Sequence, residues 1–288
     1  MKSDTESRKG RVLSQETSVQ PPNGAATQED AVATRRRSGP LVPRWMMRLI
    51  LAVVFIGGWE LASGRLVEDY FISSPSRIAV RFWELLVDGT LLDNVGVTVI
   101  AVVIGFIVGA IAALLLGYAL GSSPYWASVV EPFITTFWSI PRVALIPLLV
   151  IWVGIGTQLA ITISAILTFF LVFFNTYYGI REVSQGLIDV VRIMGGTRRD
   201  VAVRVRIPSA FVWIAAGIKL SLPMALVGTV TAEMLASNRG LGFLVKFYGN
   251  SFDTTSTFAV LLALLIVGFL LDRLANSVSK RALVWKST

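Results

Sequence analysis

Residues 99–116 form a run of 18 positions that hold only apolar side chains or glycine. An α-helix needs about 20 predominantly apolar residues to cross the hydrocarbon core of a bilayer. A strand of a membrane β-barrel would instead alternate apolar and polar residues over about 10 positions. The run therefore predicts a membrane-spanning helix and argues against a barrel.

Other parts of the chain share this character, since 54% of all residues are hydrophobic and only 15% are charged. Soluble domains carry more charge and fewer apolar residues than this. Apolar runs bounded by charge, proline or glycine predict six transmembrane helices, at residues 45–62, 95–120, 133–153, 159–179, 211–232 and 258–271. The last run is short, and its apolar face continues through Leu274 and Val278. The predicted fold class is all-α, a polytopic membrane protein.

Small residues recur at multiples of four positions along the second predicted span, at Gly105, Gly109, Gly117 and Gly121. Glycine at this spacing lets another helix approach closely. The neighbouring helix belongs either to this chain or to another, and packing within the chain is the simpler explanation.

The distribution of Lys and Arg predicts the orientation in the membrane. If both termini lie on one side, that side carries 19 of the 26 basic residues and the other side carries 5. Arg142 and Lys219 fall within spans. Because cytoplasmic loops retain basic residues, we expect a multi-pass protein of the inner (cytoplasmic) membrane with both termini in the cytoplasm.

Residues 1–43 are polar and rich in Ser, Thr, Pro, Gly and charge, without any apolar period. Such a segment cannot bury enough surface to fold, so we expect a disordered cytoplasmic arm followed by a membrane domain at 44–288. The first apolar run starts too late for a secretory signal, which predicts an uncleaved anchor. Arg35, Arg36 and Arg37 either touch anionic lipid or only contribute to the orientation bias.

The chain contains neither Cys nor His. This composition removes thiol chemistry, imidazole catalysis and metal sites built on these residues, so we expect no enzyme activity and no metal. Gly195-Gly196-Thr197 runs into two arginines without the lysine of a phosphate-binding loop. We expect no cofactor on this chain, and any ATP must be bound by a partner subunit. Nucleic acid is not an expected partner.

A charged loop separates the fourth and fifth predicted spans. Between Glu182 and Met194, apolar residues gather on one helical face, at Val183, Leu187, Val190, Val191 and Met194. Gly195 and Gly196 are expected to end this helix. Thr197 is a plausible N-cap for a second helix, with Asp200 as its capping-box partner, and that helix is predicted to end before Pro208. Two short helices joined by a glycine elbow would form a docking surface for another protein.

This loop resembles the EAA loop of ABC importer permeases. The similarity lies in the acid followed by two apolar residues, the glycine six positions after the acid, and an aliphatic-proline pair, which are here Asp189-Val190-Val191, Gly195 and Ile207-Pro208. Asp replaces the usual Glu, and Val replaces both usual Ala residues. Further segments look like those of nitrate/sulfonate/taurine-type permeases, at residues 74–76, 140–156, 231–234 and 238–242.

The resemblance covers residues 45–285 and implies a six-span permease domain with a coupling loop at 181–208. It implies an ABC ATPase dimer docked on the loop, an extracytoplasmic substrate-binding protein and two permease subunits, for which we expect a homodimer. The implied coupling residues are Asp189, Val190, Val191, Gly195, Gly196, Arg198, Ile207 and Pro208. Arg198 and Arg199 either contact the ATPase or only set topology.

The translocation path is expected to involve residues that are costly to place in hydrocarbon or that sit near helix breaks. The candidates are Arg142, Ser221, Met224 and Thr229. Lys219 is explained by snorkelling of its long side chain. Glu233 is expected either to stabilise a turn or to meet the binding protein.

Two other classes of function remain open at this stage. A secondary transporter or channel would also show six spans, but an ion-driven carrier needs carboxylates in mid-span, and none appears here. An intramembrane enzyme is disfavoured by the absence of His and Cys. The expected substrate is a small solute, an anion such as nitrate, a sulfonate or taurine, although similar permeases also carry pyrimidine-type vitamin precursors.

Overall fold

The computed structural model describes residues 43–66, 68 and 71–283. The predicted arm, with Arg35, Arg36 and Arg37, lies outside the described residues except for Pro43. The chain divides into two compact units, Met1–Ala52 and Val53–Thr288. In the first unit the structure describes the beginning of helix α1 (Arg44–Ala62). The second unit contains the rest of α1 and all other helices.

Five helices of the described chain are long and apolar enough to cross a membrane. They are α1, α3 (Thr90–Gly121), α6 (Thr157–Arg181), α9 (Ile207–Ala236) and α11 (Thr254–Leu283). They confirm an all-α polytopic membrane protein, and they coincide with five of the six predicted spans. The last four helices extend beyond the predicted bounds, since flanking residues outside each apolar run continue the helix, as Asp93 and Asn94 do before the second run and Asp272 and Arg273 do after the last one.

The third predicted span, 133–153, is wrong as a single helix. The chain forms α4 (Pro124–Trp138), a turn, the 3₁₀ helix η1 (Arg142–Leu145) and the short helix α5 (Ile146–Val153). Pro141 stands in the turn with an extended backbone, φ −62° and ψ 110°. Proline has no N–H for the helical hydrogen bond, and its ring clashes with the preceding turn, so a helix ends there. Pro147 then occupies the first turn of α5, where a missing N–H costs nothing.

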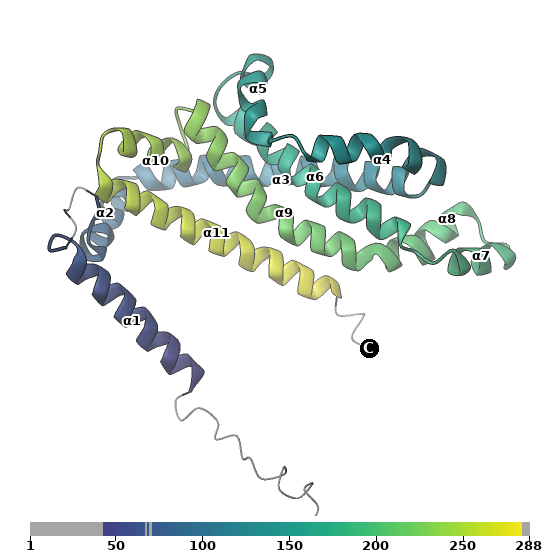
Figure 1. The fold of residues 1–288 in the computed structure, drawn as a ribbon, viewed down its shortest axis with the longest axis horizontal. Coiled ribbons are helices and arrows are strands. Elements are labelled where there is room, and N and C mark those ends of the chain that lie inside the picture. Colours follow the sequence, from purple (N-terminus) through teal and green to yellow (C-terminus); the bar gives the residue numbers. More distant parts are fainter. Residues whose placement is uncertain (1–42, 67, 69–70, 284–288) are drawn as a thin grey trace, which may run out of the picture. The chain divides into compact units, whose positions relative to one another are not determined.

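Helix α3 packs closely against α6, and α6 against α9 (Figure 1). A Cβ added to Gly109 would collide with the backbone of Ala165 in α6, and one added to Gly228 in α9 would lie 2.5 Å from Leu167 Cδ1. The small residues thus allow contact within the chain, as expected from their spacing. An apolar cluster joins α2 (Pro75–Val87), α10 (Leu241–Asn250) and α11 to α3 and α9.

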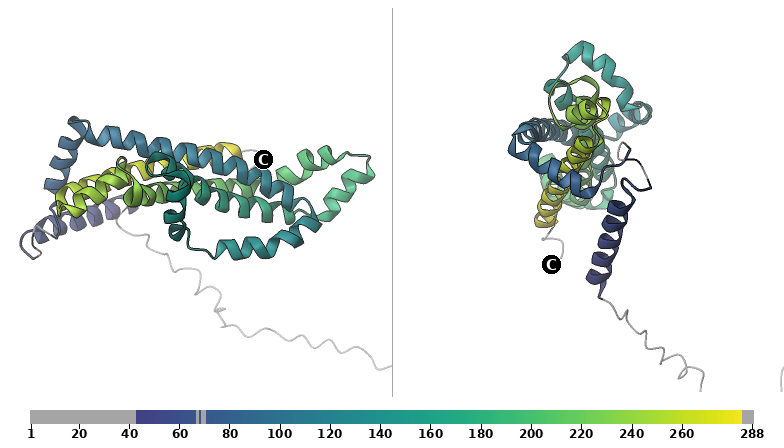
Figure 2. Two further views of the ribbon diagram at one scale, coloured as in Figure 1. Left: turned by 90° about the horizontal axis from the view of Figure 1, so that it is seen from above. Right: turned by 90° about the vertical axis from the view of Figure 1, so that its left-hand side faces the viewer.

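Four short helices of the second unit lie at the two ends of its long helices (Figure 1). Helices α7 (Gln185–Ile193) and α8 (Arg198–Val201) lie beyond the adjoining ends of α6 and α9, at what we call the loop end (Figures 1 and 2). Helices α2 and α10 lie at the other end, which we call the opposite end. The predicted coupling loop therefore stands apart from the helices that connect α1 to α3 and α9 to α11.

Candidate functional site

The first helix of the loop is α7, and it turns only part of its apolar surface inward. Ile188 is 3% exposed and packs with Val201 and Val205, and Val183 and Val191 pack partly against the same cluster. Leu187, Val190 and Met194 of the predicted face are 55%, 54% and 81% exposed, and Ile193 is 86% exposed. The predicted apolar face is therefore divided between an inner set that fixes the helix and an outer set that has no cover within the described chain.

The glycine elbow ends α7 as predicted. Gly195 has a φ of +83°, a left-handed conformation that costs glycine little. Its N–H donates to the Arg192 carbonyl at 2.9 Å, and the Gly196 N–H donates to the Val191 carbonyl at 2.9 Å. These two bonds form a Schellman motif, which satisfies carbonyls at the end of a helix. Gly196 has no room for a side chain, because an added Cβ would lie 2.5 Å from Val191 Cγ1.

The predicted capping box at the start of the second helix is confirmed. The Asp200 N–H donates to Thr197 Oγ1 at 3.2 Å, and the Thr197 N–H donates to Asp200 Oδ2 at 2.9 Å. Each side chain thus accepts a backbone donor that a helix start leaves without a partner. The elbow between α7 and α8 is therefore fixed by hydrogen bonds on both sides.

The prediction that the second helix ends before Pro208 is wrong. Helix α8 continues through a π-helical turn, η2 (Ala202–Arg206), directly into α9. The Ile207 N–H donates to the Ala202 carbonyl five residues back. Pro208 follows at the start of α9, and the widened turn accommodates its missing N–H and its ring. Pro208 thus marks a change of helical pitch rather than a helix end.

The structure brings most of the predicted coupling residues onto this loop surface. Asp189 is half exposed, accepts a hydrogen bond from Gln185 Nε2 at 3.1 Å and lies 3.7 Å from Arg192 Nη1. Val190 and Ile207 are exposed, and Val191 is partly buried. The acid thus interacts within its own helix and remains accessible to a partner.

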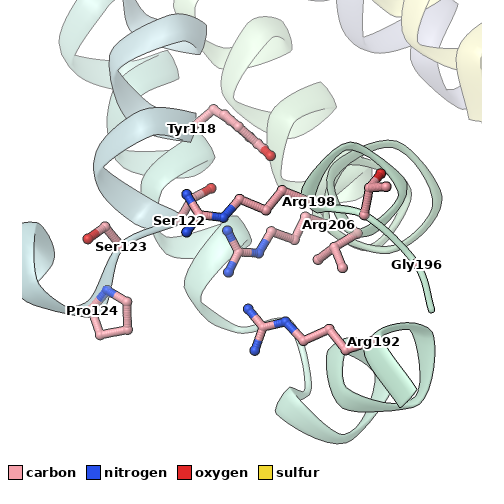
Figure 3. Close-up of a pocket in the computed structure, with 10 residues that line it drawn as sticks. Tyr118, Ser122, Ser123, Pro124, Arg192, Gly196, Arg198 and Arg206 are labelled. Carbon is pink, nitrogen blue, oxygen red and sulfur yellow. The ribbon is translucent and has the colours of Figure 1, made fainter. Parts of the chain in front are cut away.

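A pocket of about 670 Å³ opens between the loop and the turn that joins α3 to α4 (Figure 3). The predicted residues Gly196 and Arg198 line it, together with residues that sequence reasoning did not single out as functional: Tyr118, Ser122, Ser123, Pro124, Arg192, Val201 and Arg206. Thr197 completes the lining. Ser122 and Arg206 are 84 residues apart in the chain, so nothing local could have predicted that they share a pocket.

The predicted path residues of α9 do not share one face. Ser221 and Thr229 are buried, and Ser221 Oγ donates to the Ile218 carbonyl at 2.9 Å. Met224 is exposed on another side of the helix, and Lys219 is exposed as well. Arg142 begins η1, at the helix break, and the structure does not describe its side chain. Their roles in a path stay predictions.

Glu233 lies at the opposite end and is 1% exposed. Its carboxylate accepts hydrogen bonds from Thr98 Oγ1 at 2.9 and 3.0 Å and from the Gly242 N–H at 2.8 Å. Thr98 Oγ1 in turn accepts from the Leu241 N–H at 2.8 Å. The side chain therefore joins α9 and α3 to the first turn of α10. This contact agrees with the first of the two roles predicted for Glu233, the stabilisation of a turn. Within the described residues, no group of three carboxylates is placed to hold a metal ion.

Comparison with known proteins agrees with this architecture. A family model described as the binding-protein-dependent transport system inner membrane component matches residues 101–284. The aliphatic sulfonates transport permease SsuC of Bacillus subtilis is 29% identical over 92% of this chain and 96% of its own length. The taurine transport system permease TauC of Escherichia coli is 26% identical over 82% of this chain and 87% of its own.

Two further similarities extend the comparison. The riboflavin transport system permease RibX of Chloroflexus aurantiacus is 30% identical over 83% of this chain and 89% of its own length. Among solved structures, an inward-facing form of the MetNI methionine ABC transporter matches 68% of this chain and 95% of its own, with 23% identity and a TM-score of 0.54. That structure supports the fold. This chain therefore belongs to the family of inner membrane components of binding-protein-dependent transport systems.

Proposed function

We propose that this chain is the permease subunit of an ATP-driven importer, with both termini in the cytoplasm. In this proposal α7, the glycine elbow and α8 dock on a separate ATPase dimer, which binds and hydrolyses the ATP. A second copy of the chain completes the translocation path, and a substrate-binding protein approaches the opposite end. The excess of Lys and Arg on the loop side supports this orientation.

The observation that carries the proposal is the exposed apolar surface of α7. Leu187, Val190, Ile193 and Met194 lie on a loop that is otherwise rich in arginine. The inner residue Ile188 and the Schellman motif hold this surface in place. Exposed apolar patches with a polar rim are typical of protein–protein contacts, and a preformed helix loses little entropy on binding.

The names of the relatives guide the choice of substrate. The SsuC and TauC names refer to aliphatic sulfonates and taurine, which share a sulfonate group. RibX and a formylaminopyrimidine permease of Halalkalibacterium halodurans are named for riboflavin and a pyrimidine. We propose a small solute delivered by the binding protein, with a sulfonate as the first class to test.

The path is proposed to use the exposed side of α9 near Met224. Leu220, Met224 and Val227 recur there at helical spacing and have no cover within the described chain. A second copy packed across this side would leave Met224 near the interface between copies. Arg142 keeps its proposed role at the helix break beside the path. Ser221 and Thr229 are buried on another side of α9, so their proposed role is to position the helix that lines the path.

The test replaces an outer residue of α7 with a charged one. Ile193→Asp should leave the chain in the membrane but abolish both co-purification of the ATPase and solute uptake. Val87→Asp is the matched control, because Val87 is equally apolar and 70% exposed but ends α2 at the opposite end. It should retain the ATPase. If the ATPase is recovered equally with Ile193→Asp and with the wild-type chain, α7 is not part of the docking surface. Recovery of the wild-type chain alone, even after mild crosslinking, would favour a secondary transporter or channel.

A further inference from the structure

Three arginine side chains from different helical turns meet in the pocket at the loop end. Arg192 comes from the last turn of α7, Arg198 begins α8, and Arg206 ends η2. All three extend toward the wall formed by Tyr118, Ser122, Ser123 and Pro124 (Figure 3). The lining residues include no Asp or Glu. The pocket therefore concentrates positive charge in a concave space.

Of the three arginines that line the pocket, one lies near a carboxylate of the described chain. Asp189 lies 3.7 Å from Arg192, and Asp200 lies 3.3 Å from Arg204, which is outside the pocket lining. Neither Arg198 nor Arg206 has a carboxylate within 4.0 Å among the residues that the structure describes. At least two guanidinium groups are thus available to an anion.

The wall opposite the arginines contains a hydroxyl group without a partner among the described residues. Ser122 Oγ is buried and has no hydrogen-bond partner in the described part of the chain, and it belongs to the residues that line this pocket. A buried polar group without a partner is costly, so native structures usually provide one. Guanidinium forks and a serine hydroxyl together match the oxygens of a phosphate group.

The surroundings of the pocket indicate where such a phosphate comes from. The pocket lies where the membrane-spanning helix α3 ends, and Tyr125 and Trp126 are exposed directly after it, at the start of α4. Tyr and Trp are typical of the interface between hydrocarbon and water. Leu115 and Leu116 expose apolar surface along the last two turns of α3. Basic pockets between transmembrane helices at such an interface bind anionic lipid headgroups.

We propose that this pocket binds the phosphate of an anionic phospholipid headgroup, with Arg198 and Arg206 as its principal ligands and with the buried Ser122 hydroxyl donating once its side chain turns toward the pocket. The volume of about 670 Å³ exceeds that of one phosphate and leaves room for the glycerol portion. The site is separate from the outer surface of α7, and it does not depend on the identity of the transported solute. A bound lipid would join the loop to the α3–α4 turn.

The experiment measures retention of phosphatidylglycerol by the full-length chain. The purified protein is reconstituted in nanodiscs of phosphatidylcholine with one-fifth phosphatidylglycerol, released into detergent, and examined by native mass spectrometry. Each Lys or Arg near a membrane surface contributes roughly 1 kcal/mol, so Arg198→Gln with Arg206→Gln should weaken retention by about 30-fold. Arg199→Gln with Arg204→Gln is the matched control, because it removes the same two charges from the same loop outside the pocket lining, and it should retain the lipid.

The remaining outcomes separate lipid from other anions. Wild-type protein should prefer phosphatidylglycerol to phosphatidylcholine, and millimolar inorganic phosphate or methanesulfonate should not displace it. Displacement by these small anions would overturn the lipid proposal in favour of a free-anion site. Equal loss of lipid from the control with Arg199→Gln and Arg204→Gln would reduce the effect to general surface charge. The variant with Arg198→Gln and Arg206→Gln is also tested for co-purification of the ATPase. If it loses the ATPase but retains the lipid as well as the wild-type protein does, the arginines belong to the protein interface instead. The preference of the wild-type protein for phosphatidylglycerol over phosphatidylcholine is measured without any substitution. It therefore tests the site even if a variant does not fold.

Discussion

Removal of the Glu233 carboxylate should weaken the opposite end of the structure more than removal of any exposed carboxylate. In Glu233→Ala the Gly242 N–H and the Thr98 hydroxyl both lose their acceptor while remaining buried. Each such orphaned donor costs about 1–3 kcal/mol, so the free energy of unfolding should fall by about 2–6 kcal/mol. Glu233→Gln keeps one acceptor oxygen and should cost about half as much.

The free energy of unfolding is measured by SDS titration in mixed micelles, and hydrogen exchange follows the amides of α10. The Glu233→Ala variant should show faster exchange at Leu241 and Gly242, because Thr98 loses its own anchor as well. Glu84→Ala serves as the control, since its carboxylate is exposed and, among the residues that the structure describes, pairs only with Arg81 three residues back. Such a pair contributes about 0–1 kcal/mol. If Glu233→Ala costs no more than Glu84→Ala, the reasoning from buried hydrogen bonds is refuted.

Three other substitutions test the close contacts and the loop. Gly109→Val should prevent the α3–α6 contact and abolish accumulation of folded protein in the membrane, whereas Gly96→Val on the same helix has open space and should accumulate normally by fluorescence-detected chromatography. Gly195→Glu places a side chain where φ is +83° and should leave the protein inserted but abolish transport-coupled ATP hydrolysis; normal hydrolysis and uptake would contradict the role of the elbow. Thr197→Ala removes the capping box and should destabilise the start of α8 by about 0.5–2 kcal/mol, seen as faster exchange of the Asp200 amide, and unchanged exchange would show that the cap is not stabilising.

Features with a local cause could be predicted from the sequence. The capping box of Thr197 and Asp200 spans three residues, and the Schellman motif needs only glycine after a helix. Both depend on interactions that are complete within one turn. The long apolar spans are predictable for a similar reason, because every backbone group in hydrocarbon must be satisfied within its own helix.

Features that depend on tertiary contacts could not be predicted in the same way. Thr98 and Glu233 are 135 residues apart, and no pattern in the sequence pairs them. The apolar face of α7 was predicted as one surface, yet Ile188, which was not among the predicted residues, is the one that α8 and η2 bury. Periodicity shows that a helix has an apolar side, but only the neighbouring elements decide which part of that side is covered.

The two prolines at which predicted helix bounds were wrong differ in what surrounds them. The helix break expected beside Arg142 is found at Pro141, where the chain turns into an extended conformation, although the apolar run 133–153 had been counted as one span. Pro208 had been expected to stop a helix, yet η2 widens by one residue and carries the helix past it. Hydropathy alone distinguishes neither case, because it measures the tendency to leave water and not the geometry of the backbone.

The continuity at Pro208 determines how the loop is connected to the membrane. Residues Arg198–Ala236 form 39 consecutive helical positions, with α7 held against the first turns through Ile188. Glu233 holds α10 near the other end of the same stretch. A straight α-helix transmits displacement along its axis, whereas π-turns and prolines are where helices bend. Both features occur together at residues 202–208. Pro223 lies inside α9 and is a second place where this stretch can bend. A movement of the docked loop must therefore either displace α9 as a whole or be absorbed at η2 or at Pro223, and these two places set the stiffness of the connection.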